Sequence, residues 1–157
     1  MTPSNIYAAG AVDILTIFED FVDGSSTRIA LALGFEPLAN EARNAIDKSL
    51  QSFGYGPDSC SFASIGPRDL DAEGGDTKLD PQSLFLLIEA LDPLLLVVAD
   101  EAAARILAQA YRTAFNLDAA CRVFGRPTVV FRDLTSLLET AEGKQKAWTL
   151  LKTLPKR

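Results

Sequence analysis

A carboxylate follows directly after the first apolar strand that the sequence predicts. Residues 27–33 read Thr-Arg-Ile-Ala-Leu-Ala-Leu and run into a short turn, Gly34-Phe35-Glu36-Pro37. A helical segment begins only a few residues later, so this stretch is typical of the first β-α turn of a parallel sheet. Open α/β folds bind their ligands at the carboxyl ends of such strands. Glu36 is therefore the first candidate for chemistry.

Three further strands are predicted, and their ends supply the remaining candidates. The first two cover residues 59–65 and 94–99. The last is supplied by residues 122–124, a turn at 125–127 and residues 128–131. Right-handed crossovers would bring the ends of all four strands to one edge of the sheet. We therefore expect one crevice at that edge, with a ligand pocket drawn from Gly34, Phe35, Glu36, Pro37, Ser64, Arg132 and Asp133, and with Asp100 and Glu101 beside it.

Each candidate also has a purely structural interpretation. Glu36 lies just before a helix, where the helix dipole favours a carboxylate without any catalytic duty. Phe35 could pack in the core or the loop, and Arg132 with Asp133 could form a surface pair or cap the turn that follows. The sequence leaves these alternatives open.

The elements that would position these residues alternate between strands and helices. Predicted helices cover 4–22, a segment capped by Asn40, residues 82–91 after the Asp80 cap, residues 101–115 after the Asp100 cap, and a last helix that ends at Leu154. A loop is predicted from 66 to 79. This order predicts a single domain over 1–157, with an N-terminal helix within 1–24 and a three-layer α/β/α core over 27–154 around a four-stranded, mainly parallel sheet.

The composition of the chain disfavours several classes of function. The 157 residues include no histidine and only two cysteines, Cys60 and Cys121, so we expect neither a metal site nor a cofactor, and free buried thiols. No membrane span or secretory signal is predicted, and we expect a soluble cytoplasmic protein. The net charge of −6 disfavours DNA as a partner. The last 17 residues are nevertheless basic, and the first 24 carry four acidic residues and no basic one.

Over residues 27–154 the chain resembles the uracil-DNA glycosylase superfamily. The resemblance rests on the acid-bearing turn 34–37 and on a helix that ends near Pro93 before the apolar strand 94–99. It also rests on the C-terminal run of a Gly-Arg-Pro turn at 125–127, a strand, a leucine pair at 137–138, and a basic helix that carries Trp148. The resemblance implies that Glu36 would orient water or stabilise the sugar cation, and that the position of Asp133 would act on the departing base.

This chain departs from the family at the catalytic positions. Asp133 stands where the family has a histidine, and a carboxylate disfavours a developing anion. Residues 63–65 offer no amide to read a base, only the hydroxyl of Ser64, and no aromatic loop separates the first turn from its helix. Two cysteines cannot supply the four ligands of an iron-sulfur cluster.

These departures favour a degenerate, non-catalytic member of the fold that binds a protein partner in DNA replication or repair. The acidic first helix or the basic last helix would be the partner surface. A similarity to the small psi subunit of bacterial clamp-loader complexes points the same way. The alternative is an active DNA glycosylase in which Glu36 orients water for release of a damaged base. A third interpretation is a flavodoxin-like domain that binds a nucleotide or a flavin. The oligomeric state is not predicted.

Overall fold

The computed structural model describes residues 18, 21–23, 29–66 and 79–157. Most of the helix predicted at 4–22 and of the loop predicted at 66–79 lies outside these residues. The end of that helix is wrong, because Val22 belongs to a short strand, β1 (Val22–Asp23).

A six-stranded sheet forms the centre of the described structure. Its order is β1, β3 (Cys60–Ser64), β2 (Ala30–Gly34), β4 (Leu95–Val98), β6 (Arg126–Val130) and β5 (Ala119–Val123). The four inner strands run parallel, whereas β1 and β5 are antiparallel edge strands. The prediction of an α/β fold with a mainly parallel sheet is confirmed, and the predicted number of four strands fits only the parallel centre.

The β5–β6 hairpin is the part of the sheet that the sequence interpretation missed. The turn was placed at Gly125-Arg126-Pro127, but it lies at Phe124 and Gly125, which have φ values of 48° and 81°. Arg126 and Pro127 are the first residues of β6. Two positive φ values in a two-residue connection are characteristic of a type I′ turn, whose twist suits a hairpin. Residues 119–123 thereby become a separate antiparallel strand.

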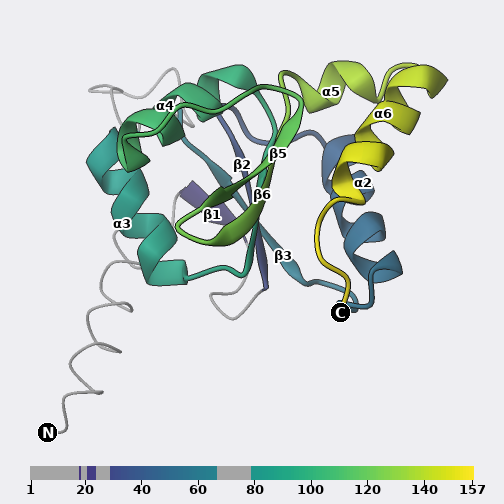
Figure 1. The fold of residues 1–157 in the computed structure, drawn as a ribbon, viewed down its shortest axis with the longest axis horizontal. Coiled ribbons are helices and arrows are strands. Elements are labelled where there is room, and N and C mark those ends of the chain that lie inside the picture. Colours follow the sequence, from purple (N-terminus) through teal and green to yellow (C-terminus); the bar gives the residue numbers. More distant parts are fainter. Residues whose placement is uncertain (1–17, 19–20, 24–28, 67–78) are drawn as a thin grey trace, which may run out of the picture.

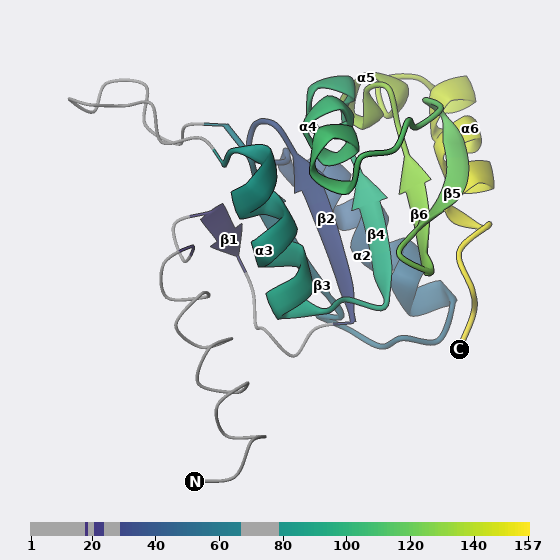
Figure 2. The same cartoon turned by 60° about the vertical axis from the view of Figure 1, so that its left-hand side comes forward.

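Five helices among the described residues cover the two faces of the sheet (Figures 1 and 2). Helices α2 (Asn40–Ser52), α5 (Leu134–Leu137) and α6 (Ala141–Leu151) lie on one face. Helices α3 (Pro81–Leu91) and α4 (Glu101–Tyr111) lie on the other. No helix in the described part of the chain is long and apolar enough to cross a membrane.

Successive side chains of an inner strand point to opposite faces of the sheet and so contribute to both apolar layers. In β2, Ala30 and Ala32 belong to the layer under α2 and α6, whereas Leu31 and Leu33 belong to the layer under α3 and α4. All five residues of β2 are buried, as expected of a parallel strand covered on both faces. The apolar run at 94–99 behaves in the same way, except that Leu94 is 65% exposed.

Local caps fix where the helices begin. Asp80 accepts a 2.7 Å hydrogen bond from Ser83 N, and Pro81 follows at the first helical position, as the sequence predicts. The predicted cap of α2 is wrong, because Asn40 is already helical and Ala39 takes the cap position without a side-chain bond. The helix still begins there, since its apolar face is buried against the sheet.

Helices α5 and α6 approach each other closely at Gly143. A Cβ atom on Gly143 would lie 1.9 Å from the backbone oxygen of Leu137, closer than any such contact can be. The turn between the two helices therefore requires a residue without a side chain at position 143.

We expect Gly143→Ala to lower the free energy of unfolding by at least about 2 kcal/mol, because the clash is with backbone and no side chain can move aside. Urea denaturation monitored by circular dichroism measures this loss. Gln145→Ala, on the exposed face of the same helix, is the matched control and should stay within about 0.5 kcal/mol of the parent. Equal stability of the two variants would contradict the close approach.

A charged network ties β6 to helix α3. The Arg126 guanidinium donates to Glu89 Oε1 at 2.9 Å and to Asp92 Oδ1 at 2.8 Å, and its Nε donates to Pro93 O at 2.9 Å. The Tyr111 hydroxyl donates to the same Glu89 carboxylate at 2.9 Å. The Arg126 side chain is only 10% exposed. Its hydrogen bonds hold the pKa of Glu89 below its ordinary value, against the opposing effect of burial.

Because of this network, the free energy of unfolding should decrease at acidic pH. A carboxyl group whose pKa is lowered by folding stabilises the fold above its unfolded pKa, and that contribution disappears as the pH falls through the folded pKa. We expect Glu89→Gln to cost about 1–2 kcal/mol at pH 7 and progressively less below pH 4.5, the ordinary pKa of the group. Urea unfolding of both proteins between pH 3 and 7 tests this. A constant difference across that range would show that the Glu89 charge does not contribute.

Candidate functional site

The structure brings most of the predicted crevice residues together. A pocket of about 560 Å³ lies at the carboxyl ends of β2, β4 and β6 and is lined by residues of the segments that follow these three strands. Its lining includes Phe35, Glu36, Asp100, Glu101, Arg132 and Asp133. Four of them are carboxylates and one is a cation, so the crevice is acidic.

Asp100 has a structural role at the centre of this crevice. Its Oδ1 accepts a 2.7 Å hydrogen bond from Ala103 N and caps α4, and its Oδ2 accepts a 2.9 Å bond from Phe35 N in the first turn. The carboxylate therefore joins the end of β2 to the start of α4. Both oxygens are bonded to backbone amides, so the carboxylate is engaged by the fold.

Asp133 is likewise occupied by the backbone that follows it. Its two oxygens accept hydrogen bonds from Ser136 N at 3.2 Å and from Ser136 Oγ at 2.7 Å, so the side chain caps α5. Asp100 and Asp133 also form an antiparallel bridge, and Glu101 N donates to Arg132 O at 2.9 Å. Of the interpretations that the sequence left open for Asp133, the structure matches the helix cap.

Glu36 differs from the other carboxylates. It is exposed at the rim of the crevice, and no described residue forms a hydrogen bond or an ion pair with its side chain. Glu101, by contrast, pairs with Arg105 at 3.2 Å along the surface of α4. The crevice thus presents one acidic side chain that is not engaged by the fold.

The turn that carries Glu36 is packed tightly from within. A Cβ atom on Gly34 would lie 2.7 Å from Glu36 O and 2.8 Å from Leu38 Cδ1, so this position must be glycine. The Phe35 ring packs against Gly66, where an added Cβ would meet the ring at 3.0 Å, and belongs to the layer under α3 and α4. Phe35 therefore lies against the protein with one edge at the crevice.

Ser64 does not reach the crevice. Its side chain is buried and lies near Pro37, Leu38 and the Asp23–Arg43 ion pair, in a gap too small to admit water. Pro37 and Leu38 line both this gap and the crevice, so they separate Ser64 from Glu36. The Ser64 hydroxyl has no hydrogen-bond partner among the described residues.

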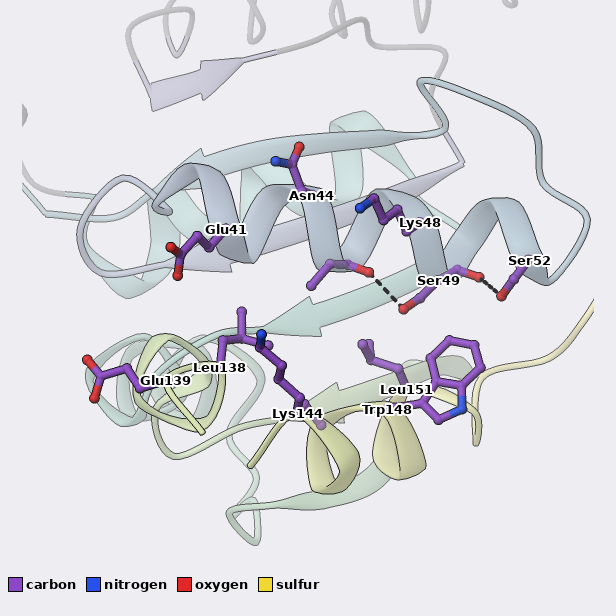
Figure 3. A pocket seen from close by; sticks show the side chains of 12 residues that line it. Glu41, Asn44, Lys48, Ser49, Ser52, Leu138, Glu139, Lys144, Trp148 and Leu151 are labelled. Carbon is purple, nitrogen blue, oxygen red and sulfur yellow. Dashed lines mark hydrogen bonds between the residues drawn. The ribbon is translucent and has the colours of Figure 1, made fainter. Parts of the chain in front are cut away.

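A larger groove of about 910 Å³ lies between α2 and α6 (Figure 3). Its apolar surface comes from Ala45, Leu138, Ala147, Trp148 and Leu151. Its polar surface comes from Glu41, Asn44, Lys48, Ser49, Ser52, Glu139 and Lys144. The groove is therefore apolar along its length and polar along its sides, which is the usual composition of a binding groove.

Charge is distributed unevenly along this groove. Glu41 and Glu139 lie at one end, on opposite sides of the groove, whereas Lys144 and Lys48 lie farther along it, towards Trp148 (Figure 3). The Trp148 ring stacks on Phe53 with a centroid separation of 5.5 Å, and Lys152 lies 5.9 Å from the centre of the Trp148 ring. The groove thus has an acidic end and a basic, aromatic end.

The sequence placed Trp148 on the basic last helix but did not predict the groove. A signal was present in α2, where Ala45, Ser49 and Ser52 form a stripe of small residues beside the apolar stripe. The hydroxyls of both serines bond to the backbone of their own helix, at 2.7 Å in each case. Small side chains that turn back on their own helix leave space beside α6.

No three histidine, cysteine, aspartate or glutamate side chains in the described segments converge closely enough to hold a metal ion. Neither Cys60 nor Cys121 forms a disulfide, and Cys60 is buried as expected, but Cys121 is only partly buried. Comparison with known proteins found neither a family model that matches the chain nor a curated protein similar to it.

The different roles of the crevice carboxylates can be separated by substitution. We expect Asp100→Ala to cost about 2–4 kcal/mol, because two backbone amides lose their acceptor, and Asp133→Ala to cost about 1 kcal/mol. Glu36→Gln should change stability by less than about 0.5 kcal/mol. Urea denaturation of the three variants measures the order. A Glu36 variant as unstable as the Asp100 variant would assign Glu36 a structural role instead.

Proposed function

We propose that this chain is a non-catalytic binding module, built on a three-layer, uracil-DNA-glycosylase-like α/β/α scaffold, that holds an amphipathic helix of a partner protein in the α2–α6 groove. The resemblance in sequence associates such a module with DNA replication or repair. The observation that carries the proposal is the groove itself, with its apolar length, its polar sides and its separated charges.

The dimensions of the groove suit a helix. Its lining extends along α2 from Glu41 to Ser52, which at 1.5 Å per residue is about 16 Å, the length of three helical turns. Helices that bind in grooves place apolar residues at helical spacing on the groove floor. Leu138, Ala147 and Leu151 offer that floor, and Trp148 offers a large aromatic contact at one end.

The charges favour one direction for the bound helix. The positive N-terminal end of a helix is stabilised by carboxylates, and its negative C-terminal end by cations. Glu41 and Glu139 would therefore face the partner's N-terminal end, and Lys48 and Lys144 its C-terminal end, where acidic residues of the partner would pair with them. This surface includes the basic last helix, which the sequence suggested as a partner surface.

The arrangement of the crevice supports a non-catalytic role. Glu36 and Asp133, which the resemblance places at the two catalytic positions, line the same crevice, but Asp133 caps α5 and Ser64 is separated by Leu38. The same proximity gives the rival proposal its support, since an exposed Glu36 beside a space of about 560 Å³ is where a glycosylase would hold water.

Groove binding is tested by site-specific photo-crosslinking in extract of the source cells. A photoreactive residue at position 52, inside the groove, should form an adduct that position 113, on the far face beyond α4, does not form. The captured protein, once purified, should bind with an affinity at least about tenfold weaker when Lys48→Glu and Lys144→Glu are combined. The fluorescence of Trp148, the sole tryptophan, reports the binding.

Glu36→Gln is the matched control and should leave this binding unchanged, because the crevice lies outside the groove. Equal adduct yields at positions 52 and 113 would contradict the proposal. So would an affinity that is unchanged when Lys48→Glu and Lys144→Glu are combined. Release of free base from oligonucleotides containing uracil or hypoxanthine, abolished by Glu36→Gln, would replace it with the glycosylase.

A further inference from the structure

Strand β5 presents an open edge of the sheet. In the described structure it is the last strand after β6, and Figure 2 shows it at the margin of the sheet. An edge strand offers unpaired N–H and C=O groups that can pair with another strand. Natural proteins block such edges with proline, lysine or bulges, but the sequence of β5 is Ala-Ala-Cys-Arg-Val.

The register within the hairpin shows which backbone groups of β5 point outward. Arg122 stands opposite Pro127, which has no N–H, so this is a non-hydrogen-bonded pair. Antiparallel pairs alternate, so Cys121 with Thr128 and Val123 with Arg126 are the hydrogen-bonded pairs. The N–H and C=O groups of Ala120 and Arg122 therefore point away from β6.

An exposed aromatic residue lies at the end of this edge. Phe124 is 66% exposed and adopts a φ of 48°, a conformation that bulky residues rarely take. Its ring makes edge contacts with Tyr111 at 4.8 Å and Phe85 at 5.8 Å, which leave most of its surface in water. A backbone that is strained at an exposed apolar residue points to a binding role for that residue.

We infer that β5 pairs antiparallel with β5 of a second copy of this chain, across a two-fold axis at Cys121. Only this register lets all outward groups of the strand pair, because Ala120 of each copy then exchanges hydrogen bonds with Arg122 of the other. Residues 119–123 overlap completely, and the two Phe124 turns flank the ends of the joined sheet.

The side chains of the strand fit this arrangement. Ala119, Ala120 and Cys121 are small and allow close approach. The Arg122 guanidinium donates to Gly125 O of its own turn at 2.8 Å, and the residue directly opposite each Arg122 is the small Ala120 of the other copy, which leaves room for the long side chain. Beside the strand, Ala120 borders an open hollow of about 310 Å³, so that a longer side chain at this position can be accommodated.

The pairing makes Cys121 a reporter of register. Opposed residues of a non-hydrogen-bonded antiparallel pair lie about 4.5 Å apart at Cα, a separation that a disulfide can bridge. Diamide, which takes up the two hydrogen atoms released by two thiols, should convert the dimer into a covalent one. Cys60 is fully buried and should not react, so Cys121→Ser should abolish the covalent dimer and leave the reversible one.

Position 120 provides a matched pair of variants. Because it faces Arg122 of the second copy, Ala120→Lys should raise the dissociation constant about tenfold, and Ala120→Glu should lower it by a similar factor. The parent should dimerise with a dissociation constant on the order of 10 μM, as expected of a small interface. Sedimentation equilibrium measures these constants, and circular dichroism verifies that the variants fold.

Three results would overturn the inference. One is a parent protein that stays monomeric at about ten times the expected dissociation constant. Another is a dimer that diamide does not link through Cys121, which would place the contact in another register or on another surface. The third is an equal effect of lysine and glutamate at position 120.

Discussion

The Asp100 carboxylate connects two of the three segments on which the candidate crevice is built. One oxygen caps α4 and the other accepts from the amide of Phe35, 65 residues earlier in the chain. Beside it, the antiparallel Asp100–Asp133 bridge joins the segments that follow the paired strands β4 and β6. Parallel strands end side by side, but their loops diverge unless something holds them. Here the partly buried Asp100 carboxylate and the bridge beside it do so. Asp100 and Asp133, which looked suited to chemistry, therefore position backbone, whereas Glu36 does not.

The parts of the fold that the sequence could predict are those with a local physical cause. Asp80 and Asp100 cap helices within three residues of themselves, and residues 95–98 are apolar at every position because the strand is covered on both faces. The sequence also predicted that Glu36, Asp100 and Asp133 lie in one crevice, because right-handed crossovers bring the ends of parallel strands to the same edge of the sheet. The hairpin was missed because its turn uses Phe124 in a left-handed conformation, whereas local preference assigns turns to the Gly125-Arg126-Pro127 sequence.

Other features depend on how distant elements pack, and no local pattern specifies them. Ser64 was expected in the crevice by its place at the end of β3, but Leu38 folds over it. The groove arises from the spacing between α2 and α6. Phe53, at the end of α2, stacks on Trp148 of α6 and joins the two helices at one end of the groove, and the close approach of Gly143 to Leu137 fixes where α6 lies relative to α5. Its residues are ordinary helix residues, and only the separation of the helices makes a binding surface of them.

The β5–β6 hairpin also bears on the order in which the sheet can assemble. It is the one pair of described strands joined by a two-residue turn, whereas each parallel pair must close a loop that contains at least one helix. Hairpins ordinarily form within about 10 μs, long before parallel strands meet. This turn, however, starts from an unfavourable backbone conformation at Phe124, and the ring contacts that offset it come from Phe85 and Tyr111 on α3 and α4. The most local contact of the sheet therefore becomes stable only once two helices have docked, and the three elements form one cooperative folding unit.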